Sequence, residues 1–198
     1  MRTTQDWDKV TLAKWPEIMR AHDLANHHQY EEAETIFRDL SRQGSIYAKV
    51  FLAHMIEKKE AAGGQDLANK LFEEAAQTGN LYAQFQAATF CFRSDNFAQA
   101  YHWARESADE GYVPSIYLMG KLYRAGLGCE ANFDYYKEYN EFAAKEGHVW
   151  ARRRLYLDMI CGKYGVLRIP IGLFQFISWL PKTLIVSYKT PDAPELQA

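Results

Sequence analysis

The stretch Gly147-His-Val-Trp-Ala151 decides the fold, because it repeats a junction that occurs three times earlier in the chain. The earlier copies begin at Gly44, Gly79 and Gly111, and each glycine stands between two stretches with helical periodicity. The four glycines recur every 32 to 36 residues. A fixed period in this range is typical of stacked helical repeats, so the sequence predicts an all-α protein.

Small and apolar residues recur at fixed distances from these glycines, and steps of three and four residues keep them on one helical face. Eleven positions before the glycines stand Ala33, Ala68, Ala100 and Tyr136; eleven positions after them stand Met55, Phe90, Leu122 and Asp158. Neither helix of a pair can bury its stripe alone, so neighbouring pairs must stack. We predict an αα-hairpin repeat solenoid with about four hairpins plus caps.

Two stretches carry a resemblance to a known family. Ala100 to Gly111 is followed by Met119-Gly-Lys-Leu-Tyr-Arg-Ala-Gly-Leu-Gly128, and Ala143 to Ala151 matches the next junction. Across about residues 17 to 162 the chain resembles the Sel-like (suppressor–enhancer-of-lin-like) repeats of the tetratricopeptide superfamily. The resemblance implies an adaptor or scaffold for protein complexes, often at membranes. Such a solenoid is expected to wind as a right-handed superhelix.

The composition excludes several classes of protein. The 198 residues carry a net charge of −2, which gives no electrostatic reason to expect nucleic-acid binding. No secretory signal is recognised at the N-terminus, so we expect a cytoplasmic protein, with membrane association as an alternative. Cys91, Cys129 and Cys161 are odd in number and widely spaced, which predicts buried reduced thiols.

Three parts of the chain differ in composition. Residues 1–162 hold the repeats, residues 163–189 are strongly apolar, and residues 190–198 are expected to be a disordered tail. In the middle part, Pro170 is expected to begin a short helix, and Pro181 to end or kink it.

Several roles are open for the apolar segment. Residues 166–188 could cap the solenoid, form a homodimer contact, or anchor a peripheral membrane-associated scaffold. In the membrane alternative, Arg168, Lys182 and Lys189 would meet the headgroups. The apolar side chains expected to enter the membrane are Phe174, Phe176, Ile177 and Trp179. A transmembrane span is disfavoured, because residues 169–180 are too short to cross the hydrocarbon core.

No sequence motif points to catalysis. The six histidines form no His-Glu-x-x-His pair, and the chain has no Cys-x-x-Cys, Gly-x-Ser-x-Gly or phosphate-binding glycine loop. We therefore predict that the protein is not an enzyme and has neither a cofactor nor a metal site.

A partner-binding face follows from the repeat register. We call the helix after each junction glycine helix A, and the helix before the next glycine helix B. The helix A positions turned away from helix B line the concave surface of such a solenoid. The candidate contacts there are Tyr82, Phe85, Tyr117, Lys121, Arg124, Trp150 and Arg153. Aromatic anchors beside cations suit a peptide with an acidic or C-terminal group.

Two alternatives remain open for this face. Several of the aromatic residues, Phe85 and Phe92 above all, could belong to the core between repeats. The run Arg152-Arg-Arg154 points in three directions on a helix, and it could simply pair with neighbouring acidic residues. Our leading hypothesis is a non-catalytic adaptor that holds a protein or peptide partner on the helix A face.

Overall fold

The computed structural model describes residues 7–59 and 64–189, and of residues 181–189 only the backbone. Within these ranges the chain forms eleven α-helices and one short 3-10 helix, with no strand. The predicted all-α fold is confirmed. The expected tail, residues 190–198, lies outside the described residues, and the handedness of the superhelix stays a prediction.

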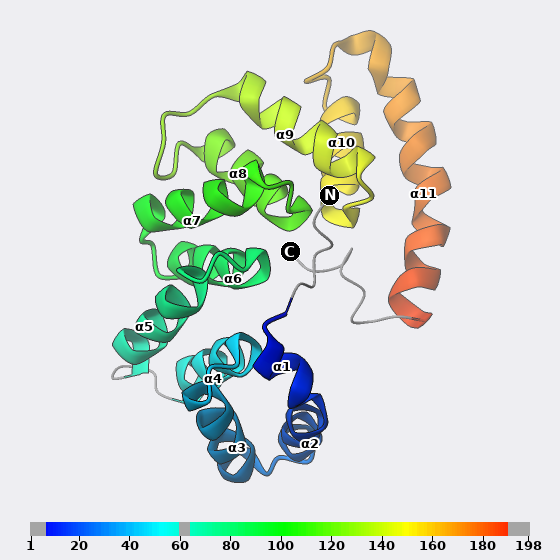
Figure 1. Cartoon of the computed structure of the whole chain (residues 1–198). Coiled ribbons are helices and arrows are strands. Elements are labelled where there is room, and N and C mark those ends of the chain that lie inside the picture. The colour runs from blue at the N-terminus through cyan, green and yellow to red at the C-terminus, as the bar shows by residue number, and fades with distance from the viewer. Residues whose placement is uncertain (1–6, 60–63, 190–198) are drawn as a thin grey trace. The chain divides into compact units, whose positions relative to one another are not determined.

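The chain divides into two compact units, Met1–Glu110 and Gly111–Ala198 (Figure 1). The boundary falls at one of the predicted junction glycines, Gly111. The helices of unit 1 are α1 (Lys9–Ala13), α2 (Trp15–Asn26), α3 (Tyr30–Arg42), α4 (Ile46–Lys59), α5 (Gly64–Ala76), α6 (Leu81–Arg93) and α7 (Phe97–Asp109). Those of unit 2 are α8 (Val113–Ala125), α9 (Phe133–Lys145), α10 (Val149–Ile160), η1 (Val166–Arg168) and α11 (Ile169–Lys189).

The junction glycines end helices as the sequence predicts. Gly44, Gly79, Gly111 and Gly147 all have a positive φ, between 78° and 98°. This is a backbone conformation that residues with a Cβ rarely adopt, so glycine stops one helix and lets the chain turn into the next.

From α2 onwards, each helix in unit 1 packs against the next, and the same holds for α8 to α11 in unit 2. The predicted stripes form the interior: Ala33, Ala68 and Ala100 are fully buried, and Phe37, Phe72 and Phe90 pack among them in unit 1. The buried-thiol prediction holds for Cys91 but is wrong for Cys161, which is exposed just after α10 ends.

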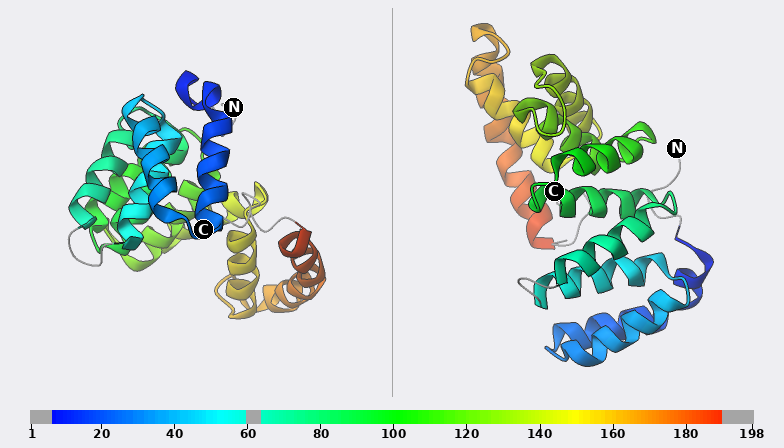
Figure 2. Two further views of the ribbon diagram at one scale, coloured as in Figure 1. Left: turned by 90° about the horizontal axis from the view of Figure 1, so that it is seen from below. Right: turned by 90° about the vertical axis from the view of Figure 1, so that its left-hand side faces the viewer.

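The C-terminal helix differs from the expectation in length. Pro181 does not end α11, which continues to Lys189. A proline already inside a helix loses one hydrogen bond but does not forbid continuation. Helix α11 lies alongside α10 in both views of Figure 2. The contact is close: a Cβ on Gly172 would lie 2.6 Å from the Met159 Cβ.

Candidate functional site

The predicted partner-binding residues fall on three helices in two units. Tyr82 and Phe85 lie on α6 of unit 1. On α8 of unit 2 lie Tyr117, Lys121 and Arg124, and on α10 lie Trp150 and Arg153. The two units are therefore considered one at a time.

In unit 2, the start of α10 is fixed by its capping residue. His148 is buried, and its Nδ1 accepts a hydrogen bond from the Ala151 backbone N–H at 3.2 Å. This satisfies one of the unpaired N–H groups at a helix start. The same imidazole lies 4.5 Å from the Tyr117 ring, centroid to centroid, so the cap also connects α10 to α8.

The three predicted cations of unit 2 lie over aromatic rings. The distances from charge centre to ring centroid are 5.9 Å for Lys121 over Tyr117, 5.6 Å for Arg124 over Tyr136, and 5.7 Å for Arg153 over Trp150. These distances are within the range of cation–π attraction. Arg124 and Arg153 are exposed, so their guanidinium groups are held by the rings while still facing water.

The charges of this region act on one hydroxyl group. Burial raises the pKa of Tyr117, the positive charges of Arg154, Arg124 and Arg153 lower it, and the negative charge of Asp158 raises it. The charges of these three arginines and of Asp158 thus all act on the Tyr117 hydroxyl. We call Tyr117, Lys121, Arg124, Trp150, Arg153 and Arg154 the cationic face of unit 2.

The carboxylate of Asp158 is hydrogen-bonded and ion-paired inside the protein. Asp158 is 1% exposed and accepts a hydrogen bond from the Tyr136 hydroxyl. Arg154 Nη2 and Lys163 Nζ lie 3.1 and 3.0 Å from its Oδ1. Burial alone would raise the pKa of Asp158, but the hydrogen bonds from Tyr136 and Lys163 and the two positive charges hold it below its ordinary value. Asp158 thus holds Arg154 and cannot neutralise Arg124 or Arg153 as well.

Sequence reasoning missed Asp158, although a signal was present. The residue stands eleven positions after its junction glycine, where the other repeats have Met55, Phe90 and Leu122. Tyr136 likewise replaces the alanine of the other repeats and is 2% exposed. A carboxylate in a position that is otherwise core predicts a buried partner.

The alternatives for the arginine run are resolved residue by residue. Arg152 donates to the Ala144 carbonyl at 3.2 Å, Arg153 lies over Trp150, and Arg154 pairs with Asp158. The three side chains point in different directions, as predicted. Pairing with an acidic residue holds for Arg154, whereas Arg153 stays exposed.

In unit 1 the corresponding face is covered by the chain itself. The Trp7 ring packs edge-on against Tyr47 at 4.9 Å and against Tyr82 at 5.4 Å. Tyr82 is half-buried, and burial raises its pKa. Phe85 is 3% exposed, which agrees with the core alternative for this residue.

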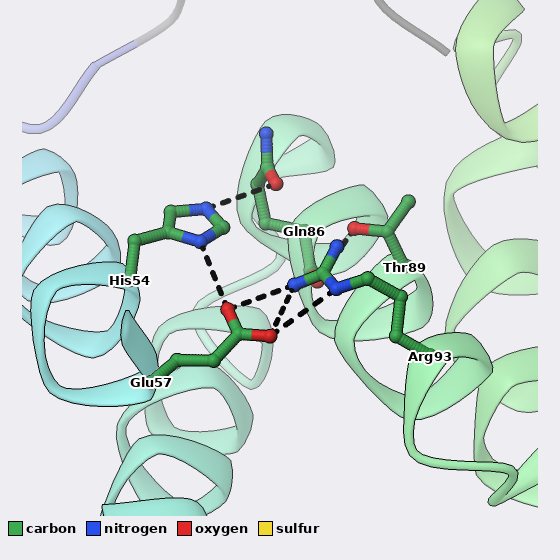
Figure 3. Close-up of polar contacts among 5 residues, drawn as sticks. All are labelled: His54, Glu57, Gln86, Thr89 and Arg93. Carbon is green, nitrogen blue, oxygen red and sulfur yellow. Dashed lines mark hydrogen bonds and ion pairs between the residues drawn. The ribbon is translucent and has the colours of Figure 1, made fainter. Parts of the chain in front are cut away.

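The charges of this face in unit 1 are paired between α4 and α6 (Figure 3). Arg93 Nη2 lies 2.8 and 2.9 Å from the two carboxylate oxygens of Glu57. His54 is placed between Glu57 Oε2, 3.4 Å from Nδ1, and Gln86 Oε1, 3.2 Å from Nε2. Burial lowers the pKa of His54, against the opposing effect of Glu57.

The proposed membrane contacts on α11 separate onto two faces. Phe174 and Ile177 are 74% and 59% exposed. Phe176 is half-buried, and Trp179 is 8% exposed with its ring 6.2 Å from that of Tyr156 on α10. Among the described residues, no helix is long and apolar enough to cross a membrane. In the same part of the chain, no three His, Cys, Asp or Glu side chains are grouped to hold a metal ion.

No family model matches the chain. Several solved structures are similar to it, among them two crystal structures. One is a protective antigen present in uropathogenic Escherichia coli strains that displays an SLR (Sel1-like repeat) fold; its TM-score is 0.62 at 19% identity, over 74% of this chain and 33% of the antigen. The other is a Sel1 repeat protein from Oxalobacter formigenes; its TM-score is 0.61 at 18% identity, over 74% of this chain and 45% of that protein.

These similarities show the fold. The chain has a Sel1-like repeat fold, as the sequence resemblance predicted. It spans less than half the length of either similar structure. Stacked helix pairs of this kind create extended surfaces.

Proposed function

We propose that the protein is a non-catalytic, cytoplasmic interaction module, and that the cationic face of unit 2 binds an acidic segment or the C-terminal carboxylate of a partner protein. The observation that carries the proposal is that Arg124 and Arg153 are exposed and lie over the rings of Tyr136 and Trp150, at 5.6 and 5.7 Å. Asp158 already pairs with Arg154 and Lys163. Arg124 and Arg153 are held over rings and form no ion pair with any described residue.

The chemistry of this face favours carboxylates. A guanidinium group offers two parallel N–H donors that match the two oxygens of a carboxylate. Trp, Tyr and Arg are also the residues that most often dominate binding energy at protein interfaces. Because the rings already hold the guanidinium groups, less side-chain freedom is lost on binding. Tyr82 and Phe85 are candidate contacts only because of their positions in the repeat. Phe85 is buried, which suits packing in the core better than direct contact with a partner.

The proposal can be tested with synthetic peptides and charge reversal. We expect peptides ending in two acidic residues to bind the intact chain, and Arg124→Glu with Arg153→Glu to weaken binding at least about tenfold, which corresponds to about 1.4 kcal/mol. The matched control is Arg42→Glu with Arg105→Glu. It makes the same charge change at side chains that are 72% and 61% exposed in unit 1.

The same peptides with amidated C-termini separate the two forms of ligand. If amidation abolishes binding, the face recognises a C-terminus; if binding persists, it recognises acidic side chains. Equal affinity of the two double variants would show that this face is not the binding site. Binding of lysine-rich peptides as tight as that of acidic ones would refute the charge argument.

A second candidate function is a peripheral membrane-associated scaffold anchored by residues 166–188. The observation that favours it is the exposure of Leu167, Phe174 and Ile177, which present 87%, 74% and 59% of their surface. A homodimer through the same segment would cover the same side chains. Sedimentation velocity across a range of concentrations distinguishes a dimer from a monomer that binds vesicles.

A further inference from the structure

We infer that a basic cleft in unit 2, together with the apolar stripe on the outside of α11, forms a binding site for the phosphate headgroup of an anionic lipid. The inference rests on the second candidate function, membrane association, and adds the chemistry of the lipid.

The cleft has a volume of about 540 Å³ and lies between α9, α10 and the turn that leads into α11. Its apolar lining comes from Leu155, Met159 and Tyr164. Four cations also line it, Lys137, Lys145, Lys163 and Arg168, against the single acidic residue Glu141. The volume lies within the range of small-molecule sites, so a headgroup fits.

Three of the four cations are available to an anion. Lys163 is the exception, because its Nζ is 3.0 Å from Asp158 Oδ1. Lys137 lies over the rings of Phe133 and Tyr164, at 4.8 and 5.6 Å. Its ion pair with Asp134 is long, at 4.0 Å, and that carboxylate is 96% exposed, so the pair is weak and Lys137 can turn to an anion instead. Lys145 and Arg168 are exposed, and neither pairs with an acidic residue in the described part of the chain. The cleft is thus positively charged even after Glu141 is counted.

The apolar stripe begins next to the cleft. Val166 and Leu167 are 74% and 87% exposed and directly precede Arg168, which lines the cleft. Leu167 is 87% exposed on η1, just before α11. On α11, Ile171 and Phe174 are three residues apart, a spacing that keeps side chains on one face of a helix, and they are 50% and 74% exposed. The opposite face of α11 packs on α10 through Gly172 and Trp179.

The combination favours a lipid surface over an acidic peptide. Amphipathic segments that lie on membranes carry apolar side chains on one face and Lys or Arg at headgroup level. An acidic peptide would satisfy the cations of the cleft but would leave Leu167 and Phe174 in water. An anionic bilayer satisfies both, and each cation near such a surface strengthens binding about fivefold.

The test is sedimentation of the full chain with two kinds of vesicle, pure phosphatidylcholine and phosphatidylcholine mixed with phosphatidylglycerol. We expect at least about tenfold tighter binding to the mixed vesicles, and loss of most of this gain in Lys145→Glu with Arg168→Glu. The matched control, Lys58→Glu with Lys70→Glu, changes the same charge at exposed residues of unit 1 and should bind within about twofold of the natural chain.

Further measurements distinguish failure of the headgroup site from failure of membrane association. Leu167→Asp should weaken binding to both kinds of vesicle if the stripe inserts. Equal binding to both kinds of vesicle, or unchanged binding by the cleft variant, would overturn the headgroup site while membrane association stands. The absence of binding to any vesicle would overturn both. Tight binding of free glycerol phosphate, measured by calorimetry, would assign the cleft to a soluble phosphate ester instead.

Discussion

Units 1 and 2 consist of the same kind of stacked helices, but their helix A faces differ in charge. In unit 1 the cation Arg93 is paired with Glu57, and Trp7 covers Tyr47 and Tyr82. In unit 2 the carboxylate Asp158 is buried, and exposed arginines lie over rings.

The comparison shows that one repeat register can carry two different surfaces. The register fixes which positions face outward, but the charges at those positions and the segments outside the repeat decide whether the face is closed or open. Unit 1 uses the residues before its first hairpin to cover the face. Unit 2 places its carboxylate in the interior, which leaves cations outside.

The largest expected effect is a loss of stability, and it should distinguish the buried carboxylate of unit 2, Asp158, from the surface carboxylate of unit 1, Glu57. Asp158→Asn removes the charge that holds Arg154 and Lys163, and breaking a buried pair costs about 3–5 kcal/mol. We expect about 3 kcal/mol, because the two cations are 30% and 33% exposed and can partly reach water. The measurement is the free energy of unfolding in urea.

The matched variant in unit 1 is Glu57→Gln. Its partner Arg93 is 47% exposed, so the pair resembles a surface salt bridge and should contribute no more than about 1 kcal/mol. If the two variants lose equal stability, the contrast between a buried and a surface cluster is wrong.

The next effect concerns the cover of unit 1. Trp7→Ala removes two edge-on ring contacts, each worth about 0.5–1.5 kcal/mol, so we expect a loss of about 1–2 kcal/mol and increased binding of a hydrophobic dye. Trp15→Ala is the control: Trp15 is 40% exposed and has one such contact, to Tyr47 at 5.5 Å. Equal effects of the two substitutions would mean that Trp7 does not cover this face.

The smallest effect concerns pH. The two units should begin to lose stability at different pH values as the pH falls. Burial lowers the folded-state pKa of His22 and His54 in unit 1. The unfolded chain then binds protons first as the pH falls, so unit 1 loses stability below about pH 6.5. The pKa of Asp158 in unit 2 is lowered from 3.8, so its contribution is present above about pH 3.8 and is lost only below it.

Urea unfolding followed by NMR signals of each unit, at about pH 7 and pH 5.5, measures this difference. The signals of unit 1 should shift to lower urea at the lower pH. His22→Gln with His54→Gln should flatten that response. A response confined to unit 2 would contradict the assignment.

Much of the fold could be predicted from local patterns. The junction glycines gave the helix ends because a positive φ is a property of one residue and its neighbours. The alanines eleven positions before them gave the buried stripe. Of the two alternatives for Pro181, the one in which it ends the helix was wrong, because packing against α10 and the helix already formed outweigh its local effect; a kink there stays a prediction.

The candidate site was predicted only in part. Register placed Tyr117, Arg124 and Arg153 on outward positions, but it could not show that Arg124 lies over Tyr136 or that Trp7 covers Tyr82. These contacts join residues far apart in sequence, and their strength depends on distance and burial in the folded protein.

The sequence by itself determined the repeat period, the helices and the buried stripe, because each follows from residue spacing and from the backbone preferences of glycine. Only the tertiary structure decided which charges are paired and which stay exposed. Asp158 shows the physical reason: Arg154 and Lys163 are its near neighbours in sequence, but Tyr136 reaches it only when α9 packs on α10. The burial that this packing causes then makes pairing of the carboxylate necessary.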